Sequence, residues 1–267
     1  MPDTPGSLIR RAVTAACLTL AVAARTSAQS PAPGPSGPDF LTRYDFHLAA
    51  NALVVDDQRF SWDTRYGGDL DLFDYVAGRT SILVDYEAVL GDQFRPFDPN
   101  QAYYVLEVSS SYRRSGTEVA GVFHHVSRHL SDRPKQFPIA WNVVGVRVMR
   151  RFGSGITTVD ARAGAGAVTQ HSFVDYRWTG DLDLLIRRAV GPRVGVFAHG
   201  YGEMFGVDAS ANGRGAQTGG RLEVGVRVTG RAGALELFAG VERRIDADPL
   251  DFLPKRWGIA GFRLVGR

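Results

Sequence analysis

The sequence predicts an all-β fold, a single antiparallel transmembrane β-barrel of about twelve strands that follows a cleaved signal peptide. Three observations indicate it: a secretory-type leader, short segments in which apolar and polar residues alternate after Asp39, and connections that alternate between tight turns and longer polar loops. The combination is typical of the outer membrane of Gram-negative bacteria.

The N-terminal region divides into a leader and a tail. Residues 1–28 have the layout of a signal peptide, and their apolar run at 12–24 is too short to span a bilayer as a helix. Cys17, the only cysteine, leaves with the leader, so the mature chain can form no disulfide. Residues 29–40, rich in Pro, Gly and Ser, are predicted to be a flexible periplasmic tail, and 41–267 the barrel.

The charge balance argues against a nucleic-acid partner. The 267 residues carry a formal net charge of +3, and nearly all the positive charge is arginine, since Lys135 and Lys255 are the only lysines. The arginines alternate with acids along the predicted strands rather than forming a basic patch with interleaved aromatics. No nucleic acid is therefore expected among the partners.

Alternation along the predicted strands separates a polar face from an apolar one. In 221–229, Arg221, Glu223 and Arg227 oppose a row of Leu and Val. Side chains alternate across a strand, so one face should meet lipid and the other a lumen crowded with charges of both signs. The predicted strands are 42–52, 60–74, 79–90, 101–114, 117–127, 139–152, 156–169, 174–189, 192–206, 217–230, 233–244 and 256–266.

Aromatic residues near the strand ends are candidates for the girdles that flank the apolar band of such barrels. The candidates are Tyr44, Tyr103, Tyr104, Tyr112, Tyr176, Trp178 and Trp257.

The connections predict how the barrel is oriented. Barrels of this class have short periplasmic turns and long extracellular loops, and an even strand count puts both termini on the periplasmic side. The tight turns fall at 114–116, 153–155, 190–192 and 230–233, and the long loops at 91–100, 128–138, 207–216 and 245–255. A soluble β-sandwich or lipocalin-like barrel ranks second, because a small closed core has little room for so many apolar strand faces.

One segment, 122–132 (VFHHVSRHLSD), carries the residues of a possible catalytic site. His125 and Ser127 are two apart and should share the lipid-facing side of a strand. Asn142, on the next strand, has the lipid-facing parity and should lie beside His125 once the hairpin closes. Ser127 then suits a nucleophile, His125 its general base, and Asn142 the residue that orients the imidazole. A lipid-facing site would meet an ester-linked lipid without any pocket entry.

These residues resemble the outer-membrane phospholipase A family, in which a strand carries H-x-S, a Ser-Asp follows, and the next strand starts with Trp-Asn. The counterparts here are His125-Val126-Ser127, Ser131-Asp132 and Trp141-Asn142. The resemblance implies a barrel of about twelve strands with the His-Ser-Asn set on its outer wall, together with calcium dependence and activation by dimerisation. It spans only this hairpin, and Arg128-His129-Leu130 replaces the Asn-Gly-type residues that follow the serine in that family.

Two further resemblances accompany it. The H-x-S unit is similar to that of the lipid A deacylases, which have a smaller barrel. The run H-x-S-x-H-L-x-D resembles a segment of an uncharacterised bacterial outer-membrane family, from which no activity carries over.

The other polar clusters have simpler structural explanations. His124, of opposite parity to His125, should face the lumen, and a metal site built from His124, His129 and Asp132 matches no strong ligand spacing. Acids on neighbouring predicted strands should form salt bridges with lumenal arginines instead of acting as an acid–base pair. These acids are Asp69, Asp71, Asp85 and Glu87.

Two functions remain open at this point. One is a serine-type lipid acyl hydrolase that uses Ser127, His125 and Asn142. The other is a non-enzymatic barrel, either a narrow porin or a structural surface protein. The expected partners are membrane lipids or lipopolysaccharide, the outer-membrane assembly machinery and a second copy of the chain. The residues themselves assign no cofactor, and Ca²⁺ enters only through the resemblance.

Overall fold

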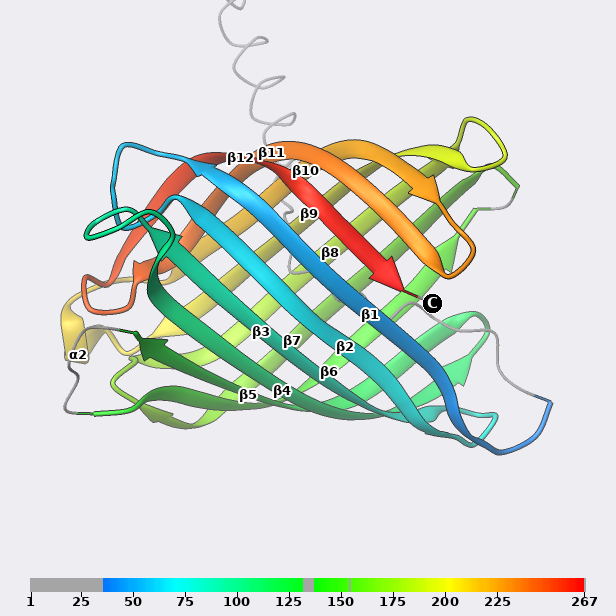
Figure 1. The fold of residues 1–267 in the computed structure, drawn as a ribbon. Coiled ribbons are helices and arrows are strands. Elements are labelled where there is room, and N and C mark those ends of the chain that lie inside the picture. Colours follow the sequence, from blue (N-terminus) through cyan, green and yellow to red (C-terminus); the bar gives the residue numbers. More distant parts are fainter. Residues whose placement is uncertain (1–35, 132–136, 154, 267) are drawn as a thin grey trace, which may run out of the picture.

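The computed structural model describes residues 36–131, 137–153 and 155–266 and shows a closed antiparallel barrel. Each strand pairs with its sequence neighbours, and β1 closes the sheet against β12 (Figure 1). The predicted signal peptide and most of the predicted tail lie outside the described residues. The strands are β1 (Asp39–Val54), β2 (Trp62–Asp74), β3 (Arg79–Gly91), β4 (Asp98–Arg114), β5 (Thr117–Leu130), β6 (Ile139–Phe152), β7 (Thr157–Ser172), β8 (Tyr176–Ala189), β9 (Val194–Val207), β10 (Gln217–Thr229), β11 (Gly233–Asp248) and β12 (Leu253–Gly266).

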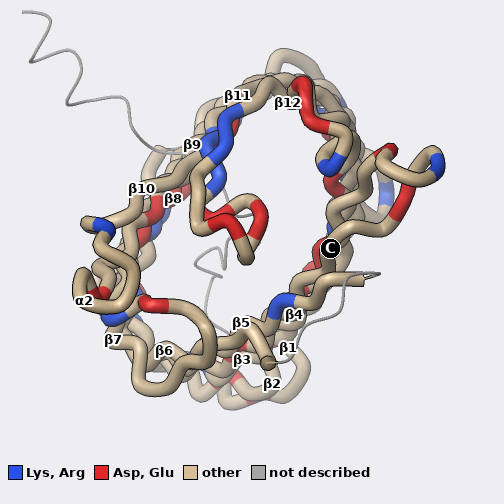
Figure 2. Tube along the Cα trace, turned by 90° about the vertical axis from the view of Figure 1, so that its left-hand side faces the viewer, with Lys and Arg blue, Asp and Glu red and all other residues tan. Residues whose placement is uncertain are grey.

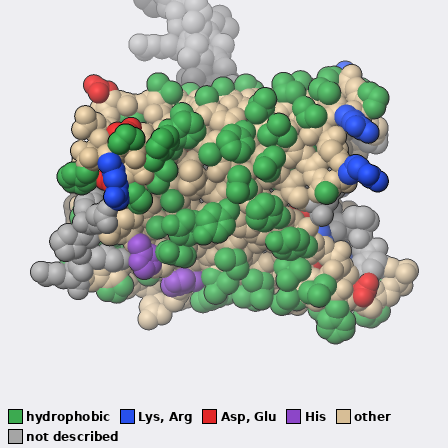
Figure 3. Space-filling model, viewed as in Figure 1, with side chains coloured by type: hydrophobic (Ala, Val, Ile, Leu, Met, Phe, Trp, Pro, Cys, Tyr) green, Lys and Arg blue, Asp and Glu red, His purple; other side chains and the backbone are tan. Residues whose placement is uncertain are grey.

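The barrel is apolar outside and charged inside. On β10, Glu223 is fully buried in the lumen, whereas the side chain of Val224 next to it is 58% exposed on the outer wall. Apolar side chains cover the outer wall seen in Figure 3. Burying charge and exposing Val and Leu is unfavourable in water but favourable where lipid surrounds the wall. The protein is therefore an outer-membrane β-barrel, as the alternation predicts.

The long loops and the short turns lie at opposite ends of the barrel. The loops and the one-turn helix α2 (Ala209–Asn212) occupy one end, and the turns lie at the other, together with the start of β1 and the C-terminal end of β12 (Figure 1). By the loop-length rule, the end with the turns is periplasmic. No helix in the described part of the chain is long and apolar enough to cross a membrane.

The aromatic girdle is smaller than predicted. Tyr44, Tyr104, Tyr112 and Trp178 are exposed on the outer wall. The other three candidates are buried in the lumen, which makes their assignment to the girdle wrong: Tyr103, Tyr176 and Trp257.

Strand register and side-chain parity explain these errors. Tyr176 shares its parity with the outward Trp178, but a register shift between the two turns Tyr176 inward. Tyr103 and Trp257 sit at positions of inward parity, where Trp257 donates to Glu242 at 3.3 Å. An aromatic residue near a strand end faces lipid only where its parity allows it.

Ion pairs join strands across the lumen. Arg244 on β11 donates to Asp63 on β2 at 2.6 Å, to Glu87 on β3 at 2.7 Å and to its near neighbour Glu242 at 2.7 Å. The predicted pairing of Asp69, Asp71, Asp85 and Glu87 with lumenal arginines is confirmed. The lumen is thus cross-linked by charge.

The last residues of β11 and the connection to β12 fold into the extracellular mouth (Figure 2). A register shift precedes Asp248, and Asp246, Ala247 and Asp248 are almost completely buried. Asp246 accepts hydrogen bonds from Arg214 at 2.6 Å and from the Tyr176 hydroxyl at 2.6 Å. These contacts hold an acidic segment across the opening.

A second carboxylate strengthens this closure. Arg214 also bonds to Asp175, at 2.6 Å. Burial alone would raise the pKa of Asp175, but hydrogen bonds from Arg214 and Asn212 outweigh it and hold that pKa below its usual range. A carboxyl group whose pKa is lower in the folded state than in the unfolded state stabilises the fold at pH values above its ordinary pKa. This stabilisation is lost as the pH falls through the lowered pKa of the folded state. The mouth contacts should therefore persist in mild acid.

We expect the folded barrel to conduct no ions across a membrane. In planar bilayers at pH 5 to 7, the wild-type chain should give no single-channel steps, because we expect the acidic segment at the mouth and the cross-lumen pairs to obstruct the passage. The Asp246→Ala variant removes the acceptor for Arg214 and Tyr176 and should produce intermittent steps. Stable steps from the wild-type protein would contradict the closed lumen and favour the porin interpretation.

Candidate active site

The hairpin of β5 and β6 brings the predicted residues together. His125 pairs directly with Asn142, and Ser127 pairs with Ala140. Phe123 and Val144 share the outward face with them and are 42% and 52% exposed. The hydrolase hypothesis requires His125 and Asn142 to be direct cross-strand neighbours and the Ser127 side chain to point outward. The structure meets both conditions.

Asn142 fixes the protonation pattern of His125. The His125 Nδ1 atom lies 2.6 Å from the Asn142 Oδ1 atom, and an amide oxygen can only accept, so Nδ1 carries the proton. The Asn142 Nδ2 atom donates in turn to the Gln170 Oε1 atom on β7 at 3.0 Å, which holds the amide in this orientation. In the neutral ring this tautomer makes the Nε2 atom the proton acceptor, as a general base requires.

Ser127 makes a different contact from the one expected. Its Oγ atom shares a hydrogen bond of 3.0 Å with the Nε2 atom of His129, and among the described residues none joins it to His125. The two histidines lie two residues before and after Ser127 on the same face, so both are within reach of its hydroxyl. The His129 ring is held edge-on against Tyr104, with centroids 5.0 Å apart.

Sequence reasoning missed His129 as a partner of Ser127. His129 was considered only as a metal ligand, although positions 125, 127 and 129 have the same parity in one strand. That shared parity was the available signal. A stretch of H-x-S-x-H in a strand places the serine between two imidazoles on one face.

A row of tyrosines shows where Ser127 lies along the membrane normal. Tyr66, Tyr86 and Tyr104 pair in register across β2, β3 and β4, and Tyr104 pairs with Ser127. Successive rings lie 4.8 and 5.0 Å apart. Tyrosine rings gather where lipid meets water, so Ser127 lies at the interfacial level near the long loops. Histidine side chains appear on the outer wall toward this end in Figure 3.

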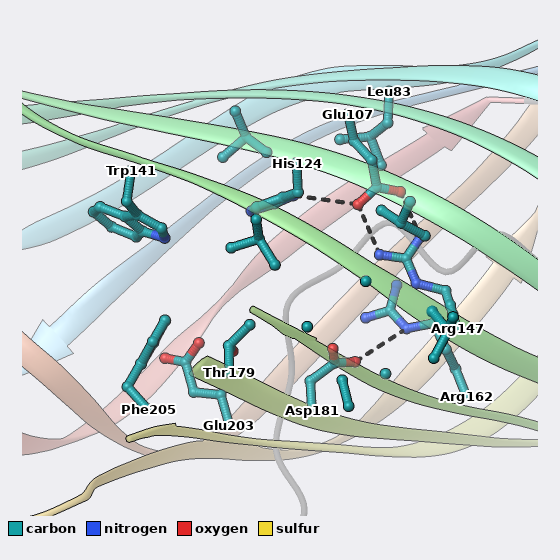
Figure 4. A pocket seen from close by; sticks show the side chains of 18 of the residues that line it. Leu83, Glu107, His124, Trp141, Arg147, Arg162, Thr179, Asp181, Glu203 and Phe205 are labelled. Carbon is teal, nitrogen blue, oxygen red and sulfur yellow. Dashed lines mark hydrogen bonds and ion pairs between the residues drawn. The ribbon is translucent and has the colours of Figure 1, made fainter. Parts of the chain in front are cut away.

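His124 belongs to the other side of the wall. It faces a lumenal cavity of about 110 Å³, where its Nδ1 atom lies 3.2 Å from the Glu107 carboxylate (Figure 4). Arg147 binds the same carboxylate, and Arg162 and Asp181 pair nearby. As predicted, His124 is a lumen residue, and the barrel wall separates this cavity from Ser127.

The described residues contain no cluster of acidic, histidine or cysteine side chains that could form a metal site. Calcium is bound by several oxygen ligands, mainly carboxylates and carbonyls. No group of three or more His, Cys, Asp or Glu residues in the described ranges could hold a metal ion. His124 and His129 face opposite sides of the wall, and Asp132 lies outside the described residues.

Comparisons with known proteins support the fold. No protein-family model matches the chain, and no curated protein matches it. Outer membrane phospholipase A from Escherichia coli superposes with a TM-score of 0.52 and 11% identity, over 85% of this chain and 98% of that one. The Salmonella typhi outer membrane phospholipase dimer with bound calcium gives 0.50 and 12%, over 84% and 90%. The shared architecture is the outer-membrane β-barrel. Identity this low shows the fold and leaves activity to the site itself.

Proposed function

We propose that this protein is a serine-type lipid acyl hydrolase whose site opens to the membrane from the outer wall of the barrel. The observation that carries the proposal is the His125–Asn142 hydrogen bond on the outward face, two residues from Ser127. It orients an imidazole as a base next to a hydroxyl. The neighbouring tyrosine row supports an interfacial depth for that hydroxyl, where ester-linked lipids would be in contact with the wall.

The reaction would proceed by acyl transfer. Rotation about the Cα–Cβ bond moves the Ser127 Oγ atom from His129 toward His125. The Oγ atom attacks the ester carbonyl carbon while the Nε2 atom of His125 takes its proton. The proton then passes to the leaving alcohol oxygen, which departs as a lysolipid and leaves an acyl-serine. Water, deprotonated by His125, then attacks the acyl carbon. The bond from that carbon to the Ser127 Oγ atom breaks, His125 returns the proton to the Oγ atom, and the fatty acid leaves.

The fold comparison is consistent with this proposal. The two similar structures are of proteins named outer membrane phospholipases, and one of them is a dimer with bound calcium. For the present chain, phospholipid as substrate, dimerisation and calcium use are parts of the proposal. The lumenal contacts give no comparable support to a pore.

The test is fatty-acid release from phospholipid by the mature chain refolded in detergent. It should be run with calcium and with chelator, and over a range of protein concentrations. Release that rises with protein concentration would support the dimeric form, and loss in chelator would support calcium use. No release above background in any arm would reject the proposal and leave a structural surface protein as the better interpretation.

The two histidines should differ in importance. His125→Ala should reduce turnover by about a thousandfold, because it removes the base that Asn142 orients. His129→Ala removes only the resting partner of Ser127 and should change turnover by less than about tenfold. The measurement is kcat for each variant on one phospholipid. A large loss in His129→Ala with a small one in His125→Ala would reverse the assignment of the base.

A further inference from the structure

Three strands that run toward the short-turn end carry an outward arginine at or near their last outward position. These residues are Arg114 on β4, Arg150 on β6 and Arg188 on β8, and all three are exposed. The outward position two residues before each arginine is an exposed hydrophobic or aromatic residue, namely Tyr112, Val148 and Ile186. On β6 the exposed Phe152 follows Arg150, so the three arginines lie close to the periplasmic edge of the apolar wall.

None of these three arginines forms an ion pair with a described residue. Arg150 donates to the Thr117 hydroxyl at 3.3 Å and lies over the ring of Phe152. The carboxylates of Glu118 and Asp160 lie close by in the fold, but both are buried and paired with other arginines. The three guanidinium groups therefore present positive charge without a described carboxylate partner.

Two of the arginines flank one position. Arg114 pairs with Thr117 across β4 and β5, and Thr117 pairs with Arg150 across β5 and β6. Neighbouring strands lie about 4.8 Å apart, so the two arginine backbones are about 10 Å apart with a hydroxyl between them. Two guanidinium groups at that spacing can converge on one phosphate, which each can bind with paired N–H donors.

The surface beside this position suits acyl chains. Tyr112, Val119 and Val148 are exposed on the outer wall at the next level toward the membrane centre, with exposed fractions of 57%, 46% and 42%. A bound molecule with a phosphate at the arginines and apolar chains along these side chains has the shape of a phospholipid in the leaflet at the short-turn end.

We propose that Arg114, Thr117 and Arg150 form a binding site for the headgroup of an anionic phospholipid in the periplasmic leaflet. Long arginine side chains keep their stems on the apolar wall and their charges at the headgroups. Positive charge next to an anionic leaflet strengthens binding by about fivefold for each arginine. The site lies at the opposite end of the barrel from Ser127 and does not depend on the proposed hydrolase activity.

The test counts lipids retained by the full chain. The refolded protein in detergent is titrated with phosphatidylglycerol or with phosphatidylcholine, and native mass spectrometry gives the bound fraction. The wild type should retain phosphatidylglycerol in preference to phosphatidylcholine. The double variant Arg114→Gln/Arg150→Gln should weaken phosphatidylglycerol binding by about 25-fold, fivefold for each charge. The double lysine variant keeps both charges and should retain most of the preference.

Arg256→Gln is the matched control, because Arg256 is an exposed arginine at the long-loop end. It should leave binding unchanged. The proposal is overturned if the wild type binds both lipids equally, or if Arg256→Gln weakens binding as much as the double variant. Displacement of the lipid by millimolar inorganic phosphate would overturn the lipid assignment in favour of a free-phosphate site. Heat-modifiable migration on gels confirms that each variant has folded.

Discussion

Ser127→Ala should reduce fatty-acid release by about a thousandfold or more while the barrel still folds. The alanine removes the only atom that can form the acyl intermediate. His125 could then act only as a base for water, which is much less effective without the covalent step. The Ser127 side chain contributes one hydrogen bond on the outer wall, to His129, so its loss should change stability by only about 1 kcal/mol.

Ser110→Ala provides the matched control for this variant. Ser110 is an exposed serine on β4 toward the short-turn end, away from Ser127, and its Oγ atom lies 3.2 Å from the Tyr75 hydroxyl. Replacing its side chain should leave both turnover and folding unchanged. Equal fatty-acid release from the wild type and from Ser127→Ala would mean that the His-Ser-Asn arrangement does not catalyse the reaction measured.

Arg244→Leu should be among the most destabilising single substitutions in the barrel. Arg244 is the shared partner of Asp63, Glu87 and Glu242, and its guanidinium also lies over the Trp257 ring. Leucine would leave three carboxylates close together in the lumen with their main counter-charge removed. Breaking a buried ion pair by removing one partner costs about 3–5 kcal/mol.

Urea unfolding in lipid vesicles, followed by tryptophan fluorescence, measures this loss. Arg177→Gln is the matched control, because Arg177 and Asp208 form an exposed pair in which little should change. Arg244→Leu should shift the midpoint to a clearly lower urea concentration. An unchanged midpoint would show that lumenal water, not Arg244, compensates the charge of the three acids.

The barrel was predictable because its signals repeat. Alternation such as that of 221–229 recurs along strand after strand, so an error in one strand does not change the result. The placement of Tyr176 was not predictable, because a single register shift moves a side chain to the other face and leaves no clear mark in the sequence. The inward course of the β11–β12 connection was missed for a similar reason. Its composition is that of any polar loop, and its burial depends on distant partners such as Arg214 and Tyr176.

The candidate site was predictable in part. The contact between His125 and Asn142 followed from parity and hairpin pairing alone, because both are local properties of two adjacent strands. The choice of Ser127 between His125 and His129 depends on side-chain rotamers and on Tyr104, which lies on a different strand. The role of Gln170 depends on a third strand, whose register with Asn142 is shifted and could not be read from spacing.

Covalent labelling tests the central claim most directly. The folded protein in lipid would be treated with a long-chain fluorophosphonate, and the modified peptide identified by mass spectrometry. A serine activated by a lipid-facing histidine should react through its Oγ atom, so the account predicts a single adduct on Ser127 that is lost in His125→Ala. Absence of an adduct on Ser127, or equal labelling of Ser127 in His125→Ala, would contradict the account.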